Sequence, residues 1–213
     1  MAGKMPRWVN SDMLTAVGSF GALLTGLGYV LTALDIRWLW LSSFGLLVNW
    51  FGDSLDGTLA RVRNCQRPIY GYYLDHTMDC ICEAFMFIGA GLSPLLRMDI
   101  AMAAYILYLL MTVNVAVNAH LRSEFKLTYA KLGPTEFRLI IIIVNTLYIL
   151  VRPLTEYTLD TTVLGRDVTL TTLDVAMLGI VALLLIIYLV TVVNDIRYYA
   201  KVDPRKAPEE KLQ

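Results

Sequence analysis

The chain has 213 residues, of which 57% are hydrophobic and 17% are charged, and its acidic and basic residues balance at a formal net charge of zero. So few charges exclude an ordinary soluble domain, in which about a quarter of the residues are charged. The zero net charge gives no indication of a nucleic-acid partner, which basic chains favour.

Three long uncharged segments indicate helices that cross a membrane. They cover residues 13–34, 100–119 and 175–194. Each reaches the length of about 20 apolar residues that a helix needs to cross ~30 Å of hydrocarbon. We therefore predict an integral membrane protein. The first segment is longer than the apolar core of a typical signal peptide, and no convincing cleavage site follows it, so we expect it to remain as a helix.

Three further helices are predicted from less regular segments. The uncharged segment 38–52 reaches spanning length if its helix continues to Ala60. Segment 80–96 carries only Glu83 and is long enough if it begins near Tyr72, and segment 139–151 needs added turns from about Pro134. The predicted fold is an all-α integral membrane protein with six transmembrane helices, at about residues 12–34, 38–60, 72–96, 99–121, 134–152 and 173–197. These form one catalytic domain over residues 1–200, and residues 201–213 are expected to be a disordered tail.

The basic residues predict how the chain is oriented in the membrane. With six spans, both termini lie on the same side. Most of the 18 lysines and arginines fall on that side: Lys4, Arg7, Arg61, Arg63, Arg67, Arg122, Lys126, Lys131, Arg138, Arg197, Lys201, Arg205, Lys206 and Lys211. The other side holds only Arg37, Arg97, Arg152 and Arg166. This bias predicts that the termini are cytoplasmic.

Four aspartates stand next to these apolar segments. On the second predicted helix, one stripe contains Asp53, Asp56, Gly57 and Ala60, at i, i+3, i+4 and i+7. On the third, one stripe contains Gly71, Asp75 and Asp79, at steps of four. Segment 62–70 between them holds Pro68 and is expected to be a loop that turns the chain back. Two antiparallel helices would then direct four carboxylates into one polar cavity at the cytoplasmic side.

Four carboxylates in such a cavity need positive charge nearby. Two divalent cations balance them, whereas Arg61 alone does not. Because the donors are oxygens without His or Cys, we expect Mg²⁺ or Mn²⁺ rather than zinc. Paired ions favour an in-line displacement at phosphorus. The small residues Gly57, Ala60 and Gly71 leave room for a nucleotide diphosphate against the backbone.

Other interpretations of the acidic residues remain open. Four aspartates could line the ion path of a transporter, although their grouping with small residues in two stripes disfavours it. Glu83, one turn beyond Asp79, is expected to be a buried hydrogen-bond partner. His76 points about 100° away from Asp75 on a helix, so we expect a structural role for it.

The pattern Asp-x-x-Asp-Gly-x-x-Ala-Arg, nine residues, then Gly-x-x-x-Asp-x-x-x-Asp covers residues 53–61 and 71–79. It resembles the signature of the CDP-alcohol phosphotransferase family and matches it at every fixed position. Residues 11–15, Ser-Asp-Met-Leu-Thr, are also similar to the family's entry into the first helix, without the usual proline.

The resemblance implies transfer of a phosphate-linked group from a CDP-alcohol to the hydroxyl of a second alcohol, with release of CMP. It implies that Asp53, Asp56 and Asp75 hold one ion. It implies that Asp53, Asp75 and Asp79 hold the other, with Asp79 as the general base. The carboxylate least committed to metals is also the one freest to accept a proton. The resemblance places six residues near the nucleotide: Thr15, Asp56, Gly57, Ala60, Arg61 and Gly71.

The substrates are less constrained. In the family, the acceptor pocket draws on the loop between the fourth and fifth helices, which here carries Arg122, Lys126, Lys131 and Arg138. These residues could bind a phosphorylated acceptor, or they could serve only to orient the chain in the membrane. A compact six-helix chain favours CDP-diacylglycerol as donor and hence phospholipid synthesis. Residues 74–76 and 133–136 also resemble choline and ethanolamine phosphotransferases, which combine a soluble CDP-aminoalcohol with diacylglycerol.

An intramembrane prenyltransferase is a further alternative, because it also holds a diphosphate through Mg²⁺ and paired aspartates. Such enzymes usually have more helices and an Asn-rich first motif. Release of CMP rather than pyrophosphate distinguishes the two reactions. The resemblance also implies a homodimer in the lipid bilayer, which no residue pattern in this sequence tests.

Overall fold

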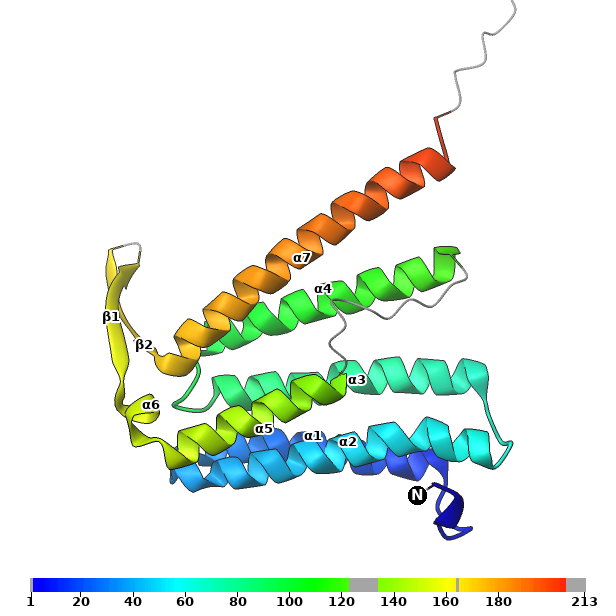
Figure 1. Cartoon of the computed structure of the whole chain (residues 1–213), viewed down its shortest axis with the longest axis horizontal. Coiled ribbons are helices and arrows are strands. Elements are labelled where there is room, and N and C mark those ends of the chain that lie inside the picture. Colours follow the sequence, from blue (N-terminus) through cyan, green and yellow to red (C-terminus); the bar gives the residue numbers. More distant parts are fainter. Residues whose placement is uncertain (1, 123–133, 164, 206–213) are drawn as a thin grey trace, which may run out of the picture.

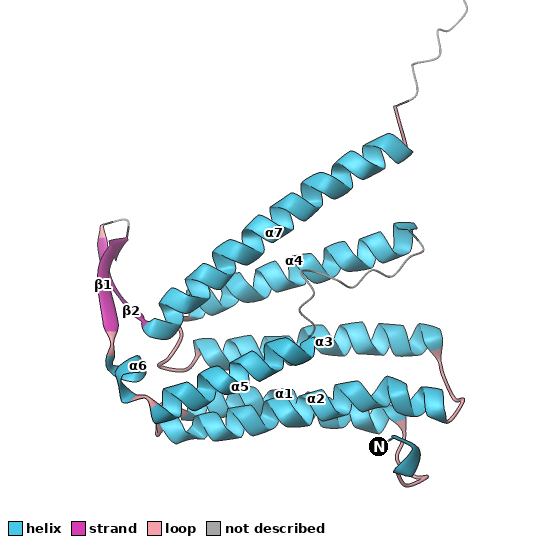
Figure 2. Ribbon diagram, viewed as in Figure 1, coloured by secondary structure: helices cyan, strands magenta, loops and turns pink. Residues whose placement is uncertain are grey.

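The computed structural model describes residues 2–122, 134–163 and 165–205, and most of them are helical (Figure 1, Figure 2). The elements in chain order are α1 (Ser11–Leu31), α2 (Leu39–Val62), α3 (Pro68–Gly91), α4 (Met98–Arg122), α5 (Pro134–Leu150), α6 (Arg152–Glu156), β1 (Thr158–Val163), β2 (Arg166–Thr171) and α7 (Thr172–Val202). Short 3-10 helices cover Ala2–Lys4 and Ile36–Trp38. A helix therefore covers most of each segment for which the sequence predicts a span.

The third long helix lies earlier in the chain than the sequence suggests. Pro68, which we expected in a loop, is the first residue of α3. Proline fits this position because its fixed φ is helical and its missing N–H needs no partner there. The connection from α2 therefore shortens to residues 63–67. At its other end α3 stops at Gly91 rather than near residue 96, and the hydroxyl of Ser93 donates to the carbonyl of Ala90 (2.6 Å) in the turn that follows.

Glycines allow α1 to lie very close to both α2 and α3. A Cβ on Gly21 of α1 would meet the backbone nitrogen of Asn49 and, at 2.7 Å, the carbonyl oxygen of Gly45, both in α2. A Cβ on Gly89 of α3 would collide in the same way with the backbone of Gly26 in α1. Small residues are what permit such close backbone contacts between membrane helices. Because α1 contacts both neighbours, it fixes the position of α2 relative to α3.

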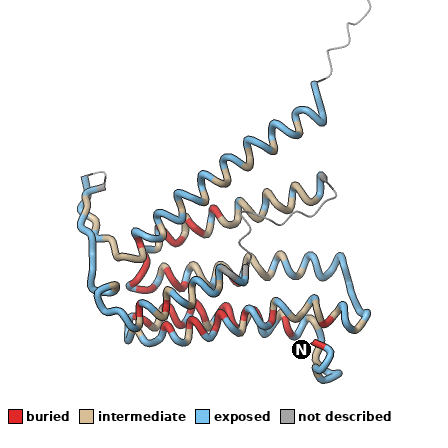
Figure 3. Tube along the Cα trace, in the orientation of Figure 1, coloured by how far each residue is buried: buried red, intermediate tan, exposed pale blue. Residues whose placement is uncertain are grey.

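Polar side chains join the helices within the packed half of the molecule. Tyr29 of α1 donates to Oδ1 of Asn145 in α5 (3.0 Å), whose amide nitrogen donates to the hydroxyl of Ser43 in α2 (3.2 Å). Asn49 of α2 donates to the carbonyl of Gly18 in α1 (3.1 Å). Figure 3 shows the buried residues gathered along this half, whereas the parts of α2 and α3 nearest their connection are mostly exposed or half-buried.

A β-hairpin that the sequence analysis did not predict precedes α7. β1 and β2 pair antiparallel, from Thr158 opposite Thr171 to Val163 opposite Arg166. The turn holds Gly165 at φ 76°, a left-handed conformation that glycine adopts readily. The threonines and valines of these two segments are the strand signal that the analysis missed.

Asp174, whose side chain is fully buried, fixes the start of α7. Its carboxylate accepts hydrogen bonds from the backbone N–H groups of Thr171 (2.9 Å) and Arg97 (2.8 Å). The hydroxyl of Thr171 accepts from the N–H of Asp174 (3.0 Å), which completes a capping box. These bonds tie α7 to the turn before α4 and satisfy the buried charge.

Among the described residues, three helices are long and apolar enough to cross a membrane: Ser11–Leu31, Met98–Leu121 and Thr172–Val202. The apolar helix within α5 is shorter, and α2 and α3 carry the aspartates. In Figure 1 the N-terminus, the connection from α2 to α3, and the ends of α4 and α7 lie towards the same end of the molecule, and the hairpin lies at the other. Long apolar helices in this arrangement are typical of an all-α membrane protein.

We predict that Gly21→Ala lowers stability by about 1–3 kcal/mol, because its new methyl group would push against the backbone of α2. Thermal unfolding of the purified protein in detergent measures the effect. Gly179→Ala in α7 is the matched control: beyond its chain neighbours and its own helix backbone, its Cβ would meet no described atom within 4 Å, so it should leave the melting temperature unchanged or raise it slightly. Equal melting temperatures for the two variants would contradict the close packing of α1 on α2.

Candidate functional site

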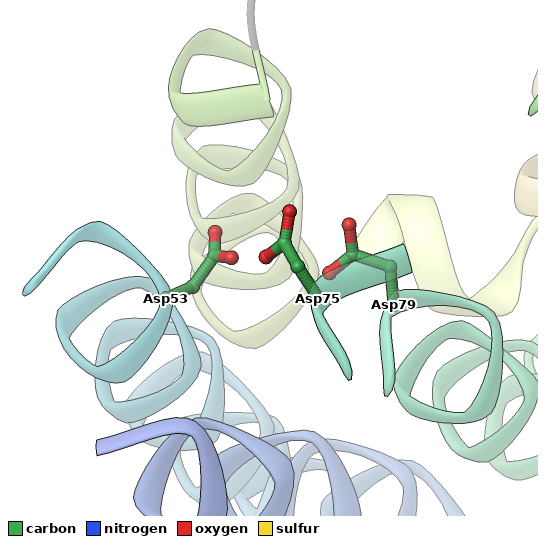
Figure 4. Close-up of side chains that lie close together, drawn as sticks. All are labelled: Asp53, Asp75 and Asp79. Carbon is green, nitrogen blue, oxygen red and sulfur yellow. The ribbon is translucent and has the colours of Figure 1, made fainter. Parts of the chain in front are cut away.

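Three aspartates from two helices meet near the connection between α2 and α3 (Figure 4). Asp53 belongs to the second half of α2, and Asp75 and Asp79 to the first half of α3. Asp75 and Asp79 share a helix face because they are one turn apart. One carboxylate oxygen from each residue lies within 4.8 Å of the other two. The fold thus brings together three of the four aspartates that the sequence singled out.

This donor set suits a hard divalent cation. All donors are carboxylate oxygens, which Mg²⁺ and Mn²⁺ prefer. Oxygens that bind one ion at about 2.0–2.5 Å lie up to about 5 Å apart, so the observed separations fit. Asp53 and Asp79 are half-buried, and three carboxylates this close repel one another unless a cation balances them.

Asp56, the fourth aspartate, is held by α1. The hydroxyl of Thr15 donates to its Oδ2 (2.8 Å), and the backbone N–H of Gly57 donates to its Oδ1 (2.5 Å). The hydroxyl of Ser11 donates to its backbone oxygen (2.6 Å). Thr15, which the resemblance places beside the nucleotide phosphates, therefore contacts Asp56 in this structure and orients its carboxylate.

All four aspartates line one small cavity between α1, α2 and α3. The other residues that line it are Thr15, Gly18, Ser19, Asn49, Met78 and Cys82. The sequence analysis did not single out Asn49, whose buried Oδ1 has no hydrogen-bond partner among the residues that the structure describes. Asn49 lies one turn before Asp53, and this i−4 spacing on the aspartate stripe is the signal that could have identified it.

The two glycines of the pattern face open space. Apart from its chain neighbours and its own turns of helix backbone, a Cβ on Gly57 or on Gly71 would meet no atom of the described chain within 4 Å. Glycine in a helix costs about 1 kcal/mol relative to alanine, and no contact with the described chain requires it at these positions. Ala60 is half-buried, and the exposed Arg61 donates to the hydroxyl of Thr58 (3.2 Å). The surface beside the carboxylates is therefore kept free of large side chains.

Arg138 of α5 reaches the aspartate group and forms an ion pair with Asp53, with 2.8 Å between Nη2 and Oδ2. The two side chains are 17% and 28% exposed, respectively. A second bond between the same helices runs from the indole nitrogen of Trp50 to the hydroxyl of Thr135 (3.2 Å). The sequence analysis expected Arg138 at an acceptor site, and the structure places it on one of the clustered carboxylates.

The other three basic residues expected at the acceptor site cannot be placed in the same way. Arg122 is the last residue of α4, but its side chain lies outside the described part of the chain. Lys126 and Lys131 lie in the segment 123–133, which is also outside it.

Two further ionisable residues of α3, Glu83 and His76, lie beside the aspartates. Glu83 contacts the side chain of Tyr108 in α4 through a hydrogen bond, but its buried Oε2 has no hydrogen-bond partner among the described residues. Glu83 therefore forms a hydrogen bond as expected, but its Oε2 is left without a described partner. The ring of His76 packs on Tyr72, with 4.0 Å between centroids, and its Nδ1 lies 3.7 Å from Oδ2 of Asp75.

Comparison of the sequence with known proteins identifies a family. The sequence model of the CDP-alcohol phosphatidyltransferase family matches residues 8–202. A phosphatidylinositol phosphate synthase from Cutibacterium acnes is 35% identical over 84 residues, which cover 39% of this chain and 38% of that relative. The match thus spans less than half of the relative's length. Because the family match extends over nearly the whole chain, the protein belongs to the CDP-alcohol phosphatidyltransferase family of transferases of substituted phosphate groups.

Proposed function

We propose that the protein synthesises a phospholipid by transferring a phosphatidyl group from CDP-diacylglycerol to the hydroxyl of an acceptor alcohol, with release of CMP. The family supports the reaction class, and the name of the C. acnes relative supports a phosphatidyl product. The observation that carries the proposal is the group of Asp53, Asp75 and Asp79, with carboxylate oxygens within 4.8 Å of one another.

Two ions of Mg²⁺ or Mn²⁺ are part of the proposal. Asp53 and Asp75 would contribute to both sites, Asp56 to one and Asp79 to the other. When bound, such ions neutralise a diphosphate and stabilise the charge that develops during in-line displacement. The all-oxygen donor set and the shared cavity of the four aspartates support this assignment.

The transfer forms one bond at phosphorus and breaks another. The acceptor oxygen attacks the phosphorus of the phosphatidyl group, and the bond from this phosphorus to the oxygen of CMP breaks, so that CMP leaves with the bonding electrons. Asp79 would take the proton of the acceptor hydroxyl. A positioned general base contributes about 10²–10⁴-fold to the rate of such a step.

The donor would lie across the two glycines. Gly57 and Gly71 face open space, so the nucleotide could approach the helix backbones there, and Ala60 adds little bulk beside them. Arg61 is exposed near the same surface and would pair with the phosphates. Thr15 would act indirectly, since its hydroxyl holds Oδ2 of Asp56.

A phosphorylated acceptor fits the basic residues Arg122, Lys126 and Lys131, because guanidinium and ammonium groups bind phosphate well, whereas Arg138 is already paired with Asp53. Inositol phosphate is the first candidate, given the product named for the C. acnes relative. A choline- or ethanolamine-type phosphotransferase is the alternative within the reaction class. A prenyltransferase and a transporter have no support from the family match.

We also propose that α1 to α5 and α7 all cross the membrane, with the termini and the aspartates at the cytoplasmic side. The excess of basic residues at that end supports this orientation. There, a soluble nucleotide and a lipid can both reach the site. A homodimer is an expectation from the family resemblance.

A screen of CMP release tests the proposed function. Reconstituted protein is given CDP-diacylglycerol or CDP-choline, each with inositol phosphate, glycerol 3-phosphate, serine or diacylglycerol. We expect CMP only with CDP-diacylglycerol and a polar acceptor, loss of release in a chelator, and recovery with Mg²⁺ or Mn²⁺. CMP release from CDP-choline and diacylglycerol alone would instead establish the alternative.

We predict that Asp79→Asn lowers the rate of CMP release at least about 100-fold, because the amide cannot accept the acceptor's proton. Asp99→Asn is the matched control, since Asp99 is an exposed partner of Arg97 at the start of α4. The control should retain the wild-type rate. If Asp79→Asn also retained it, Asp79 would not be the base.

We predict that Gly57→Val lowers CMP release at least about tenfold without lowering the melting temperature. Its side chain would enter the space proposed for the nucleotide, whereas valine is somewhat better than glycine in a helix. Gly179→Val is the control, because its side chain also meets open space but lies on α7. Full activity of Gly57→Val would show that the nucleotide does not lie against this residue.

A further inference from the structure

The aspartate group already has a cation of its own. The guanidinium of Arg138 lies 2.8 Å from Oδ2 of Asp53, and Asp53 belongs to the set of three carboxylates that could hold a metal ion. A guanidinium and a metal ion that approach the same lone pair of Oδ2 compete for it, and their positive charges repel each other wherever both bind one carboxylate. Metal binding at Asp53 therefore weakens the hold of this carboxylate on Arg138.

The carboxylate of Glu83 is a second possible partner for the displaced side chain of Arg138. Glu83 lies one helical turn beyond Asp79 on the same face of α3, and a carboxylate oxygen of Asp79 lies within 4.8 Å of one of Asp53, the present partner of Arg138. Glu83 has one buried oxygen, Oε2, without a hydrogen-bond partner among the described residues. An unpartnered carboxylate oxygen in an apolar environment is costly unless a cation or donor reaches it. Glu83 thus offers Arg138 a partner that no metal in the three-aspartate group occupies.

We propose that Arg138 is the resident counter-ion of the aspartate group, and that metal binding at Asp53 transfers its guanidinium to Glu83. This inference rests on the metal-binding role proposed for Asp53, Asp75 and Asp79. In this proposal Glu83 holds the guanidinium of Arg138 while the metal is bound. The ion pair that joins α5 to Asp53 of α2 then depends on whether the metal site is occupied.

The exchange predicts that removing the guanidinium of Arg138 increases the affinity of the site for metal. Arg138→Gln should bind Mn²⁺ about tenfold more tightly than the wild type, because a competitor for Asp53 and a nearby positive charge are both lost. If Arg138 instead served to orient Asp53 for the metal, the same variant would bind Mn²⁺ more weakly. Arg138→Lys keeps the charge and should stay close to the wild-type affinity.

Glu83 is tested by a double-mutant cycle. Glu83→Gln should weaken Mn²⁺ binding about three- to tenfold, because the displaced guanidinium loses its partner. In the Arg138→Gln background, the same change should alter the affinity less than about twofold. A direct attraction between Glu83 and the metal would instead persist undiminished in that background.

The experiment is a titration of the full chain in detergent micelles with Mn²⁺, followed by the paramagnetic resonance signal of the free ion. The variants are Arg138→Gln, Arg138→Lys, Glu83→Gln and the double variant. Arg97→Gln is the control, since Arg97 pairs with the exposed Asp99 (2.7 Å) away from the aspartates, and it should match the wild type. Melting temperatures establish that each variant is folded.

The outcomes separate this inference from the proposed function. Tighter binding by Arg138→Gln, with a Glu83 effect that depends on Arg138, supports the exchange. Unchanged or weaker binding by Arg138→Gln overturns it and leaves the enzyme proposal intact. A wild-type protein that binds no Mn²⁺ overturns both, whereas metal binding without CMP release from any donor overturns the enzyme proposal alone.

Discussion

The close approach of α1 to its two neighbours is the constraint on which the site depends. No side chain separates the backbones at Gly21 and Gly89, so α1 lies against α2 on one face and α3 on another. The carboxylates of Asp53 and Asp79 stand on these two neighbours, and their separation is therefore set by the width of α1 and its glycine contacts. A membrane interior supplies little hydrophobic driving force between helices, so close van der Waals contact is needed to hold them together.

The other half of α2 and α3, towards their connection, is mostly exposed or half-buried, and this half holds the aspartates. Glycines therefore serve two purposes in one chain. Those in the packed half admit a neighbouring backbone, whereas Gly57 and Gly71 adjoin open space. Only the second kind is free to receive a ligand. The contrast explains why composition alone would not separate a packing glycine from one that lies beside a substrate.

An ion pair and a hydrogen bond connect two further parts of the chain to the aspartates. Arg138 brings α5 to Asp53, and Thr15 brings the first turn of α1 to Asp56. The four carboxylates differ in their hydrogen-bond and ion-pair partners, although all of them line one cavity. Asp56 is oriented by hydroxyl and backbone donors, Asp53 by a guanidinium, and Asp79 by neither among the interactions that the structure describes. This difference is consistent with unequal chemical roles for residues that look equivalent in the pattern.

The sequence by itself determined the class of the protein. Uncharged segments of spanning length and a fixed spacing of aspartates and glycines are local properties, which can be recognised without knowing how the helices pack. It also predicted that Asp75 and Asp79 share a face, since helical periodicity alone requires this. It further predicted that Asp53 lies beside them, but only as a consequence of an assumed pairing of two helices, which the tertiary structure supplies through α1. Only the tertiary structure decided that Thr15 holds Asp56 and that Arg138 pairs with Asp53. These two contacts join residues 41 and 85 positions apart, and no local rule fixes the approach of separate helices. The start of α3 at Pro68 and the hairpin before α7 were missed for a simpler reason: proline and threonine each allow more than one local structure, and the surrounding chain selects among them.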